Sequence, residues 1–239
     1  MRVDLKDKVA LVVGASRGLG ECVARAFADA GTKVALVSRR ESALEDVVRG
    51  IRDEGGTAVA VTADVTRESD VAMVASTVQQ SWGLPDFVIT CVGESLLRDE
   101  LRDNTAEDWF RVFEANPTPQ FFVMREFLPD MVERGSGHII NVTSMVAVHG
   151  VAKAAAYGAA KAAAVHFSET YGAAVGKAGV NVTTVAPGPM DTPMRWEATP
   201  HFDPERAADP RDIADLFVWM ASHPGLAFDT TLVPRAVKY

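Results

Sequence analysis

Short apolar runs alternate along the chain with longer stretches in which apolar positions recur at helical spacing. The apolar runs, rich in Val and Ala, cover residues 8–13, 33–38, 57–62, 87–92, 138–143, 180–186 and 230–234. They are apolar almost throughout, which is typical of strands buried on both faces of a parallel sheet. The stretches between them predict helices over residues 19–30, 42–54, 68–82, 106–134, 154–177 and 211–222.

This alternation predicts an α/β fold, a doubly wound (Rossmann) parallel sheet of about seven strands flanked by helices on both faces. The chain has 239 residues, and no linker rich in Pro, Gly or Ser divides it. A chain of this length could form one large α/β domain or two small ones. Because no linker divides it, we expect residues 1–239 to form a single domain.

Composition and charge exclude several classes of protein. A hydrophobic fraction of 48% is too high for a disordered chain, and the net charge of −8 argues against binding to nucleic acid or an anionic membrane. No apolar run is long enough to span a bilayer, and the N-terminus lacks a signal-peptide core. Cys22, Cys91 and the scattered His residues form no metal-binding spacing. We expect a cytoplasmic protein without a metal site.

A glycine-rich turn follows the first predicted strand and leads directly into a helix. Glycines allow a tight turn and close approach to phosphates, and a helix N-terminus attracts anions. The spacing G-x-x-x-G-x-G is a variant of the dinucleotide-binding fingerprint. The motif alone is also compatible with a simple flexible strand–helix turn. The cofactor-binding residues it predicts are Gly14, Ser16, Arg17, Gly18, Leu19 and Gly20.

The end of the second predicted strand indicates which dinucleotide would bind. NAD-binding chains carry an acidic residue here that binds the ribose 2′-hydroxyl, but this chain has Ser38, Arg39 and Arg40. Arginine offers several planar donors to a phosphate, so this pair, helped by Arg17, predicts NADP(H) in preference to NAD(H). The alternative is a solvated basic pair at a helix start.

Three residues in and between the predicted fifth strand and the predicted helix over residues 154–177 could carry proton transfer. Ser144 follows the strand, and Tyr157 and Lys161 are one helical turn apart and share a helix face. Hydride transfer to a carbonyl leaves an alkoxide that needs a proton, and an ammonium lowers the pKa of a nearby phenol. We expect Tyr157 to act as acid or base, Ser144 to bind the substrate oxygen, and Lys161 to lower the pKa of Tyr157 and hold the nicotinamide ribose.

Together these motifs resemble the short-chain dehydrogenase/reductase family, in its compact single-domain branch. The resemblance extends from about Leu5 to Leu232 and identifies Ser144, Tyr157 and Lys161 as the catalytic set. It implies a fourth catalytic residue, Asn116, in a proton relay. It also implies further cofactor contacts at Asp64, Val65, Gly93, Tyr157, Lys161, Pro187, Gly188 and Thr192.

The chain departs from the family pattern in two places near the predicted site. Residues 90–93 read Thr-Cys-Val-Gly where the family usually has Asn-Asn-Ala-Gly. The hydrogen bonds that brace this loop must therefore come from elsewhere. Asn116 is followed by Pro117, which disfavours helical geometry at Asn116 and removes a backbone donor.

The sequence thus predicts an NADPH-dependent reductase of a ketone or 3-oxoacyl-type carbonyl, working reversibly; the alternative is a non-catalytic NADP(H)-binding sensor or scaffold. Apolar residues in the 189–208 segment predict a mobile lid and a moderately apolar small-molecule substrate. The predicted lining comprises Leu96, Leu97, Met145, Val146, Val148, Met190, Met194, Trp196 and Phe202. Ten Ala within residues 154–174 predict close helix packing and, with residues 106–134, a homodimer or homotetramer.

Overall fold

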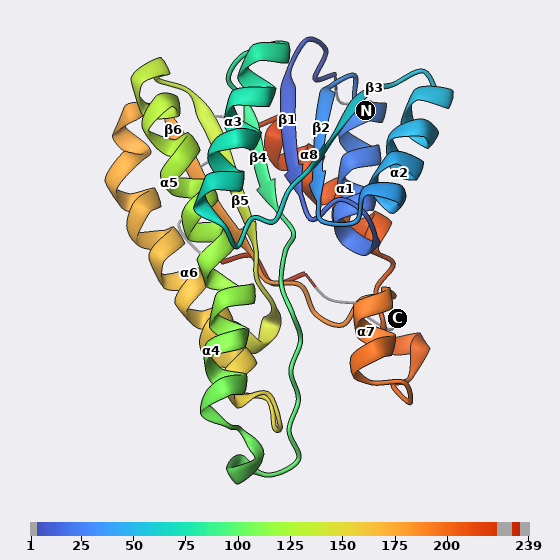
Figure 1. Cartoon of the computed structure of the whole chain (residues 1–239), viewed down its shortest axis with the longest axis vertical. Helices are drawn as coiled ribbons and strands as arrows, with labels where there is room; N and C mark the ends of the chain where they lie inside the picture. The colour runs from blue at the N-terminus through green and yellow to red at the C-terminus, as the bar shows by residue number, and fades with distance from the viewer. Residues whose placement is uncertain (1–3, 224–230, 235–239) are drawn as a thin grey trace.

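Six parallel strands form the centre of the protein, in a computed structural model that describes residues 4–223 and 231–234 (Figure 1). The strand order is β3-β2-β1-β4-β5-β6, the order of a doubly wound nucleotide-binding sheet. All five pairings are parallel. The strands are β1 (Val9–Val13), β2 (Lys33–Ser38), β3 (Thr57–Thr62), β4 (Phe87–Thr90), β5 (Gly137–Val142) and β6 (Val180–Val185).

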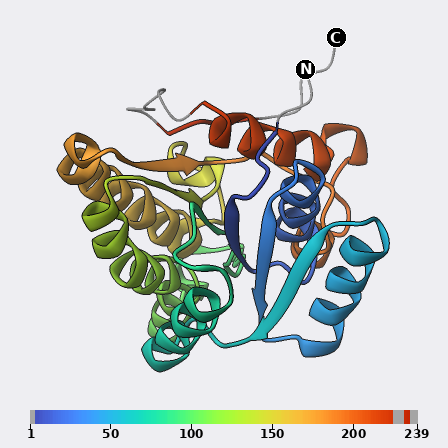
Figure 2. The same cartoon turned by 90° about the horizontal axis from the view of Figure 1, so that it is seen from above.

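Helices cover both faces of this sheet (Figure 2). Successive side chains of β1 point to opposite faces: Ala10 and Val12 pack with α1, α2 and α8, whereas Leu11 and Val13 pack with α3 and α5. Burial on both faces explains the continuous apolar runs. The helices are α1 (Gly18–Asp29), α2 (Glu41–Asp53), α3 (Glu68–Trp82), α4 (Ala106–Ala115), α5 (Pro117–Arg134), α6 (Ala155–Val175), α7 (Pro193–Ala198) and α8 (Pro210–Ala221).

The sheet has six strands where about seven were predicted. The predicted seventh strand, residues 230–234, begins outside the described residues. In the part that the structure describes, Leu232 forms an isolated parallel bridge to Val185. Its amide donates to Thr184 O at 3.0 Å, and Ala186 N donates to its carbonyl at 2.7 Å. Two residues further on, Pro234 has no N–H to donate, so only its carbonyl continues the pairing, accepting from the Gly188 amide at 2.8 Å.

The predicted helix over residues 106–134 is instead two helices, α4 and α5, which meet at Asn116. Pro117 has no N–H, so the carbonyl of Phe113 loses its helical donor. The hydroxyl of Thr118 donates to that carbonyl instead, at 3.0 Å. The chain therefore changes direction at Asn116 without leaving the Phe113 carbonyl unsatisfied.

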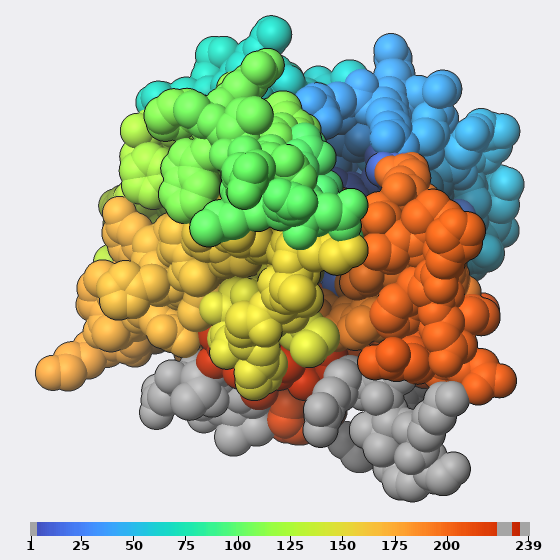
Figure 3. Space-filling model, turned by 90° about the horizontal axis from the view of Figure 1, so that it is seen from below, coloured from blue at the N-terminus to red at the C-terminus, as the bar shows by residue number. Residues whose placement is uncertain are grey.

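The strand order reverses between β1 and β4, and a crevice opens beyond the carboxyl ends of these strands. Ligands of open α/β sheets bind at such a switch point. Seen from this end in Figure 3, a hollow separates the orange segment that contains α7 from the green and yellow segments around α4 and the start of α6. The loops that line this hollow carry the predicted site residues.

Candidate active site

A cavity of about 850 Å³ lies at the switch point of the sheet. Of the catalytic and cofactor-binding residues that the sequence predicted, Asn116 alone does not line it. Those that do are Gly14, Ser16, Arg17, Gly18, Leu19, Gly20, Ser38, Arg39, Arg40, Asp64, Val65, Gly93, Ser144, Tyr157, Lys161, Pro187, Gly188 and Thr192.

The glycine-rich turn forms one end of the cavity. Gly14 has φ +87°, a conformation that favours glycine, and a Cβ on Gly20 would collide with the Gly14 carbonyl. The backbone of this turn is therefore unusually compact. No side chain caps α1, which begins at Gly18, so the N–H groups of its first turn are available to an anion. This cradle fits the pyrophosphate of a dinucleotide.

Arginines surround the same end of the cavity, but two of them already pair with carboxylates. Arg17 forms a bidentate ion pair with Glu197 of α7, and Arg39 lies 3.9 Å from Asp64. Hydrogen bonds from Arg17, together with the field of Arg40, hold the pKa of Glu197 below its usual value. The carboxylate of Glu197 thus binds one of the arginines that the sequence predicts for a ribose 2′-phosphate.

Asp64 lies beside this basic group, just after β3. Its carboxylate accepts hydrogen bonds from the Thr66 hydroxyl at 2.8 Å and from the Thr66 amide at 3.1 Å. Partial burial acts to raise the pKa of Asp64, but the two Thr66 hydrogen bonds and Arg39 hold it below its usual value. Asp64 is therefore a fixed, ionised acceptor at the cavity wall.

Tyr157 and Ser144 lie together at the other end of the cavity. Ser144 comes two residues after β5 in extended geometry, and Tyr157 lies in the first turn of α6. Burial raises the pKa of Tyr157, opposed by a hydrogen bond with Ser144 and by the charge of Arg195. The phenol is therefore neutral at pH 7 and able to donate a proton.

Lys161 is buried close to the Tyr157 ring and is held by two backbone carbonyls. Its Nζ lies 6.0 Å from the centroid of the Tyr157 ring and donates to the carbonyls of Val92 at 3.3 Å and Val142 at 3.4 Å. Burial lowers the pKa of Lys161 to about 8. Among the described residues, Arg195 carries a charge that acts to lower the pKa of Tyr157.

Asn116 acts on the loop after β4 rather than on the cavity. Its Nδ2 donates to the carbonyls of Glu94 at 3.0 Å and Val112 at 2.8 Å, and its Oδ1 accepts from the Glu94 amide at 3.3 Å. A Cβ on Gly93 would lie 2.5 Å from Asn116 Oδ1 and 2.8 Å from Lys161 Nζ. The absence of a side chain at Gly93 is what allows Asn116 and Lys161 to approach this loop.

A sequence comparison now fixes the family. Residues 8–202 match the sequence model described as short chain dehydrogenase. The chain belongs to the short chain dehydrogenase family. An uncharacterized oxidoreductase of Staphylococcus saprophyticus is 31% identical over 223 residues, which cover 93% of this chain and 94% of that protein. A second, from Staphylococcus epidermidis, is 32% identical over 220 residues, or 92% of this chain and 93% of that protein.

Solved structures agree with this assignment. A variant of actinorhodin polyketide ketoreductase with NADPH superposes with a TM-score of 0.87 at 26% identity, covering 95% of each chain. Levodione reductase, at 23% identity, shares the fold with a TM-score of 0.90 over 96% of each chain. The protein is therefore an oxidoreductase of the short chain dehydrogenase type, with a Rossmann-like sheet.

This short chain dehydrogenase braces its β4 end with residues other than the family's usual Asn pair. Thr90 Oγ1 donates to Asn141 Oδ1 at 2.8 Å, and Asn141 Nδ2 donates to Ser168 Oγ at 2.9 Å. All three side chains are buried. The network ties β4 to β5 and α6, the elements that carry the loop after β4, Ser144 and Tyr157.

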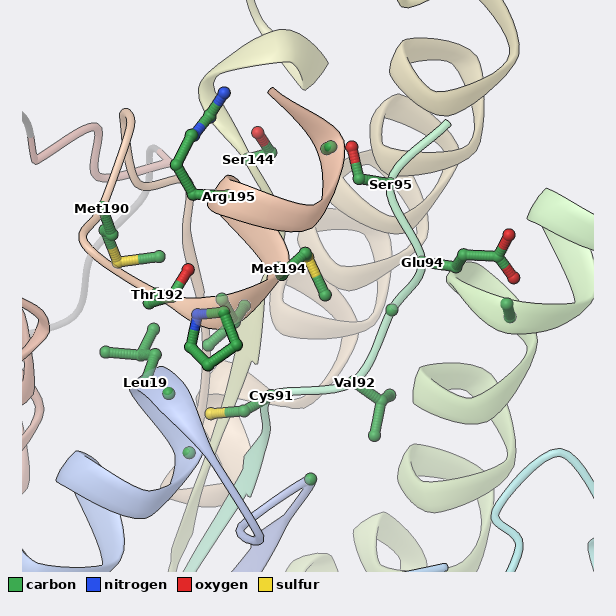
Figure 4. A pocket seen from close by; sticks show the side chains of 18 of the residues that line it. Leu19, Cys91, Val92, Glu94, Ser95, Ser144, Met190, Thr192, Met194 and Arg195 are labelled. Carbon is green, nitrogen blue, oxygen red and sulfur yellow. The ribbon is translucent and has the colours of Figure 1, made fainter. Parts of the chain in front are cut away.

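The substrate end of the dehydrogenase differs in part from the predicted lining. Leu97, Met145, Val146, Met190, Met194 and Phe202 line the cavity, but Leu96, Val148 and Trp196 do not. Trp196 donates instead to Asp191 at 2.7 Å. Two charged lining residues of α7 were missed, Arg195 and Glu197 (Figure 4 labels Arg195). In the sequence, Arg195 and Glu197 could have been found as the two charged residues of the otherwise apolar stretch 193–198.

The described residues contain neither a metal-binding cluster nor a membrane-spanning helix. Among residues 4–223 and 231–234, no group of three or more His, Cys, Asp or Glu side chains could hold a metal ion. Within the same ranges, no helix is both long enough and apolar enough to cross a bilayer.

Proposed function

We propose that this dehydrogenase is an NADPH-dependent reductase that converts a ketone or 3-oxoacyl-type carbonyl into a secondary alcohol, in a reversible reaction. The observation that carries the proposal is that Ser144, Tyr157 and Lys161 line the same cavity as the glycine-rich turn. The glycine-rich turn would hold the pyrophosphate of a dinucleotide, and Ser144, Tyr157 and Lys161 line the same cavity.

NADPH supplies the hydride when it is bound. The hydroxyl of Ser144 donates to the carbonyl oxygen and stabilises the charge that develops on it. The Tyr157 phenol, held neutral by burial, then gives its proton to that oxygen. Lys161 Nζ is held by the Val92 and Val142 carbonyls, 6.0 Å from the centroid of the Tyr157 ring, and would hold the nicotinamide ribose and act on the phenol.

Asn116 supports this site as a positioning residue in our proposal. Its amide holds the Glu94 backbone, and it lies against the position where a Gly93 Cβ would stand, next to Lys161 Nζ. The hydrogen bonds of Asn116 therefore hold in place the loop that lies against Lys161 Nζ. Asp64, Val65, Pro187, Gly188 and Thr192 are assigned to the cofactor by their place along the cavity.

The preference for NADPH over NADH rests on the basic end of the cavity. Arg17, Arg39 and Arg40 all line it, next to Ser38 at the end of β2. Guanidinium groups bind phosphate through several parallel hydrogen bonds, whereas an unphosphorylated ribose offers them only neutral hydroxyls.

We also propose that residues 1–239 act as one nucleotide-binding domain in the cytoplasm, with residues 189–208 as a lid. The lid candidate contains α7, and Glu197 of α7 forms an ion pair with Arg17 of the glycine-rich turn. Closure of this segment over the bound substrate would exclude water from the reacting carbonyl.

Self-association as a homodimer or homotetramer is proposed from exposed aromatic residues on α4 and α6. The side chains of Trp109, Phe110 and Tyr171 are 41%, 71% and 38% exposed. Large apolar groups on a surface favour burial against another surface, and light scattering at micromolar concentration would test it.

The decisive experiment measures NADPH oxidation with a panel of ketones and acyl thioesters, for the native protein and for Tyr157→Phe. We expect turnover to fall by at least about 100-fold in the variant, because general acid catalysis contributes roughly that much, while NADPH binding persists. Unchanged turnover would overturn the proposed role of Tyr157. Binding of NADPH without turnover of any carbonyl would instead favour a sensor or scaffold.

A further inference from the structure

Arg195 presents unused hydrogen-bonding capacity to the substrate end of the cavity. It belongs to α7 and lines the same cavity as Ser144 and Tyr157. Its Nε is buried and has no hydrogen-bond partner, and its Nη1 makes one long hydrogen bond, 3.3 Å to Thr199 Oγ1. A buried donor without a partner costs free energy, so the site is arranged for an acceptor that the chain does not supply.

The charge of Arg195 is also uncompensated, unlike that of its neighbours. Within the part of the chain that the structure describes, no carboxylate lies within ion-pair distance of it. By contrast, Arg17 pairs with Glu197 and Arg111 pairs with Glu94, although both carboxylates line the cavity too. In a protein of net charge −8, a half-buried guanidinium without an acidic partner is a specific feature.

Packing holds the guanidinium in place. Its carbon lies 5.0 Å from the centroid of the Phe202 ring, a cation–π arrangement that fixes the plane of the group. The charge of Arg195 acts on Tyr157, which places it within electrostatic reach of the phenol. In Figure 4 the Arg195 side chain extends from α7 on the side of the cavity where Ser144 lies.

We propose that Arg195 binds a carboxylate of the substrate, so that the preferred substrates are oxo acids and the corresponding hydroxy acids. This inference rests on the proposed carbonyl reduction and adds the substrate class to it. An arginine fork matches the two oxygens of a carboxylate. The carboxylate stays unchanged in the reaction: hydride goes to the carbonyl carbon and the Tyr157 proton to the carbonyl oxygen.

The apolar lining fits the rest of such a substrate. Leu97, Met194 and Phe202 line the cavity without offering hydrogen bonds, so they suit a short hydrocarbon chain. Arg195 lines the same cavity as Tyr157 and its charge acts on the phenol, so we expect a carboxylate near the carbonyl rather than one at the end of a long chain.

The test compares short oxo acids, whose carbonyl lies one to three carbons from the carboxylate, with their methyl esters. The variants are Arg195→Gln, Arg195→Lys and, as a matched control, Arg206→Gln. Arg206 also stacks on Phe202, at 5.6 Å, but it is exposed and does not line the cavity. The measured quantity is kcat/KM of each acid divided by that of its ester.

We expect at least one acid to be preferred over its ester by the native protein. Arg195→Gln should lower that ratio by roughly 10- to 100-fold, the usual effect of losing a charge-assisted hydrogen bond. Arg195→Lys should restore part of the ratio, and Arg206→Gln should leave it unchanged.

The outcomes separate the two proposals. If esters are reduced as well as acids and Arg195→Gln lowers both equally, Arg195 only tunes Tyr157 or packs the lid, and the carboxylate site is refuted while carbonyl reduction stands. If neither acids, esters nor unsubstituted ketones are reduced, the proposed function itself fails, and the inference with it.

Discussion

Arg17 of the glycine-rich turn and Glu197 of α7 form a bidentate ion pair that links these two segments of the cavity wall. The two residues are 180 positions apart in the chain. The side chain of Glu197 is 60% exposed and that of Arg17 33% exposed, so the pair lies at the mouth of the cavity. An arginine engaged with a carboxylate cannot offer the same donors to a phosphate.

This pair predicts that Glu197→Gln strengthens NADPH binding. Loss of the carboxylate frees Arg17 for the 2′-phosphate and removes a like charge beside it, so the Kd for NADPH should fall by a few-fold while that for NADH stays nearly constant. Fluorescence titration of both cofactors measures this. A rise in both Kd values would show that the pair acts as a clasp on the lid and not as a competitor.

Arg39→Ala should weaken binding of NADPH by about tenfold or more and that of NADH little. Arg39 is 73% exposed and its contact with Asp64 is long, at 3.9 Å, so the native interaction it loses is weak. A charge-assisted bond to phosphate is worth roughly 1.5–3 kcal/mol. Arg49→Ala, on the outer part of α2, is the control; equal losses for both cofactors would place the phosphate elsewhere.

Gly93→Ala should reduce kcat by roughly 10- to 100-fold, because small displacements of catalytic groups carry such costs. The new Cβ would press on Asn116 Oδ1 and Lys161 Nζ, both of which sit on buried, hydrogen-bonded side chains. Gly176→Ala is a matched control, since a Cβ there meets nothing within 4 Å. Steady-state kinetics on the folded variants measures this loss of kcat. A Gly93→Ala protein with native kcat would contradict the proposed positioning role of Asn116.

His138 should make the fold sensitive to acid. It lies in β5, is 4% exposed, and its Nε2 is 2.8 Å from Thr183 Oγ1. Burial lowers the pKa of His138 from 6.5 to about 4. The unfolded chain therefore takes up this proton first, and the free energy of unfolding should fall by about 3 kcal/mol as pH drops from 6.5 to 4.

Urea unfolding at several pH values measures this contribution of His138. His138→Gln removes the titrating group while keeping an amide that can bond to Thr183, so its stability should decline less steeply over the same pH range. Parallel declines in the two proteins would assign the acid sensitivity to other groups.

Much of the fold could be predicted from the sequence because its signals are local. Continuous apolar runs identified the six strands, and helical periodicity placed α1, α2, α3, α6 and α8 to within about two residues. The glycine-rich turn and the spacing of Ser144, Tyr157 and Lys161 identified residues that the structure brings to one cavity. The spacing of side chains within one helix or strand does not depend on distant contacts. The same holds for the tight turn that glycine allows.

Tertiary structure alone decided the remaining features. It directed the amide of Asn116 to the Glu94 backbone, brought Glu197 to Arg17, and placed the unpaired charge of Arg195 beside Tyr157. It also buried the Tyr157 phenol, which raises its pKa. These outcomes depend on burial and on charges from segments far apart in the chain, and both arise only when the strands and helices pack against one another.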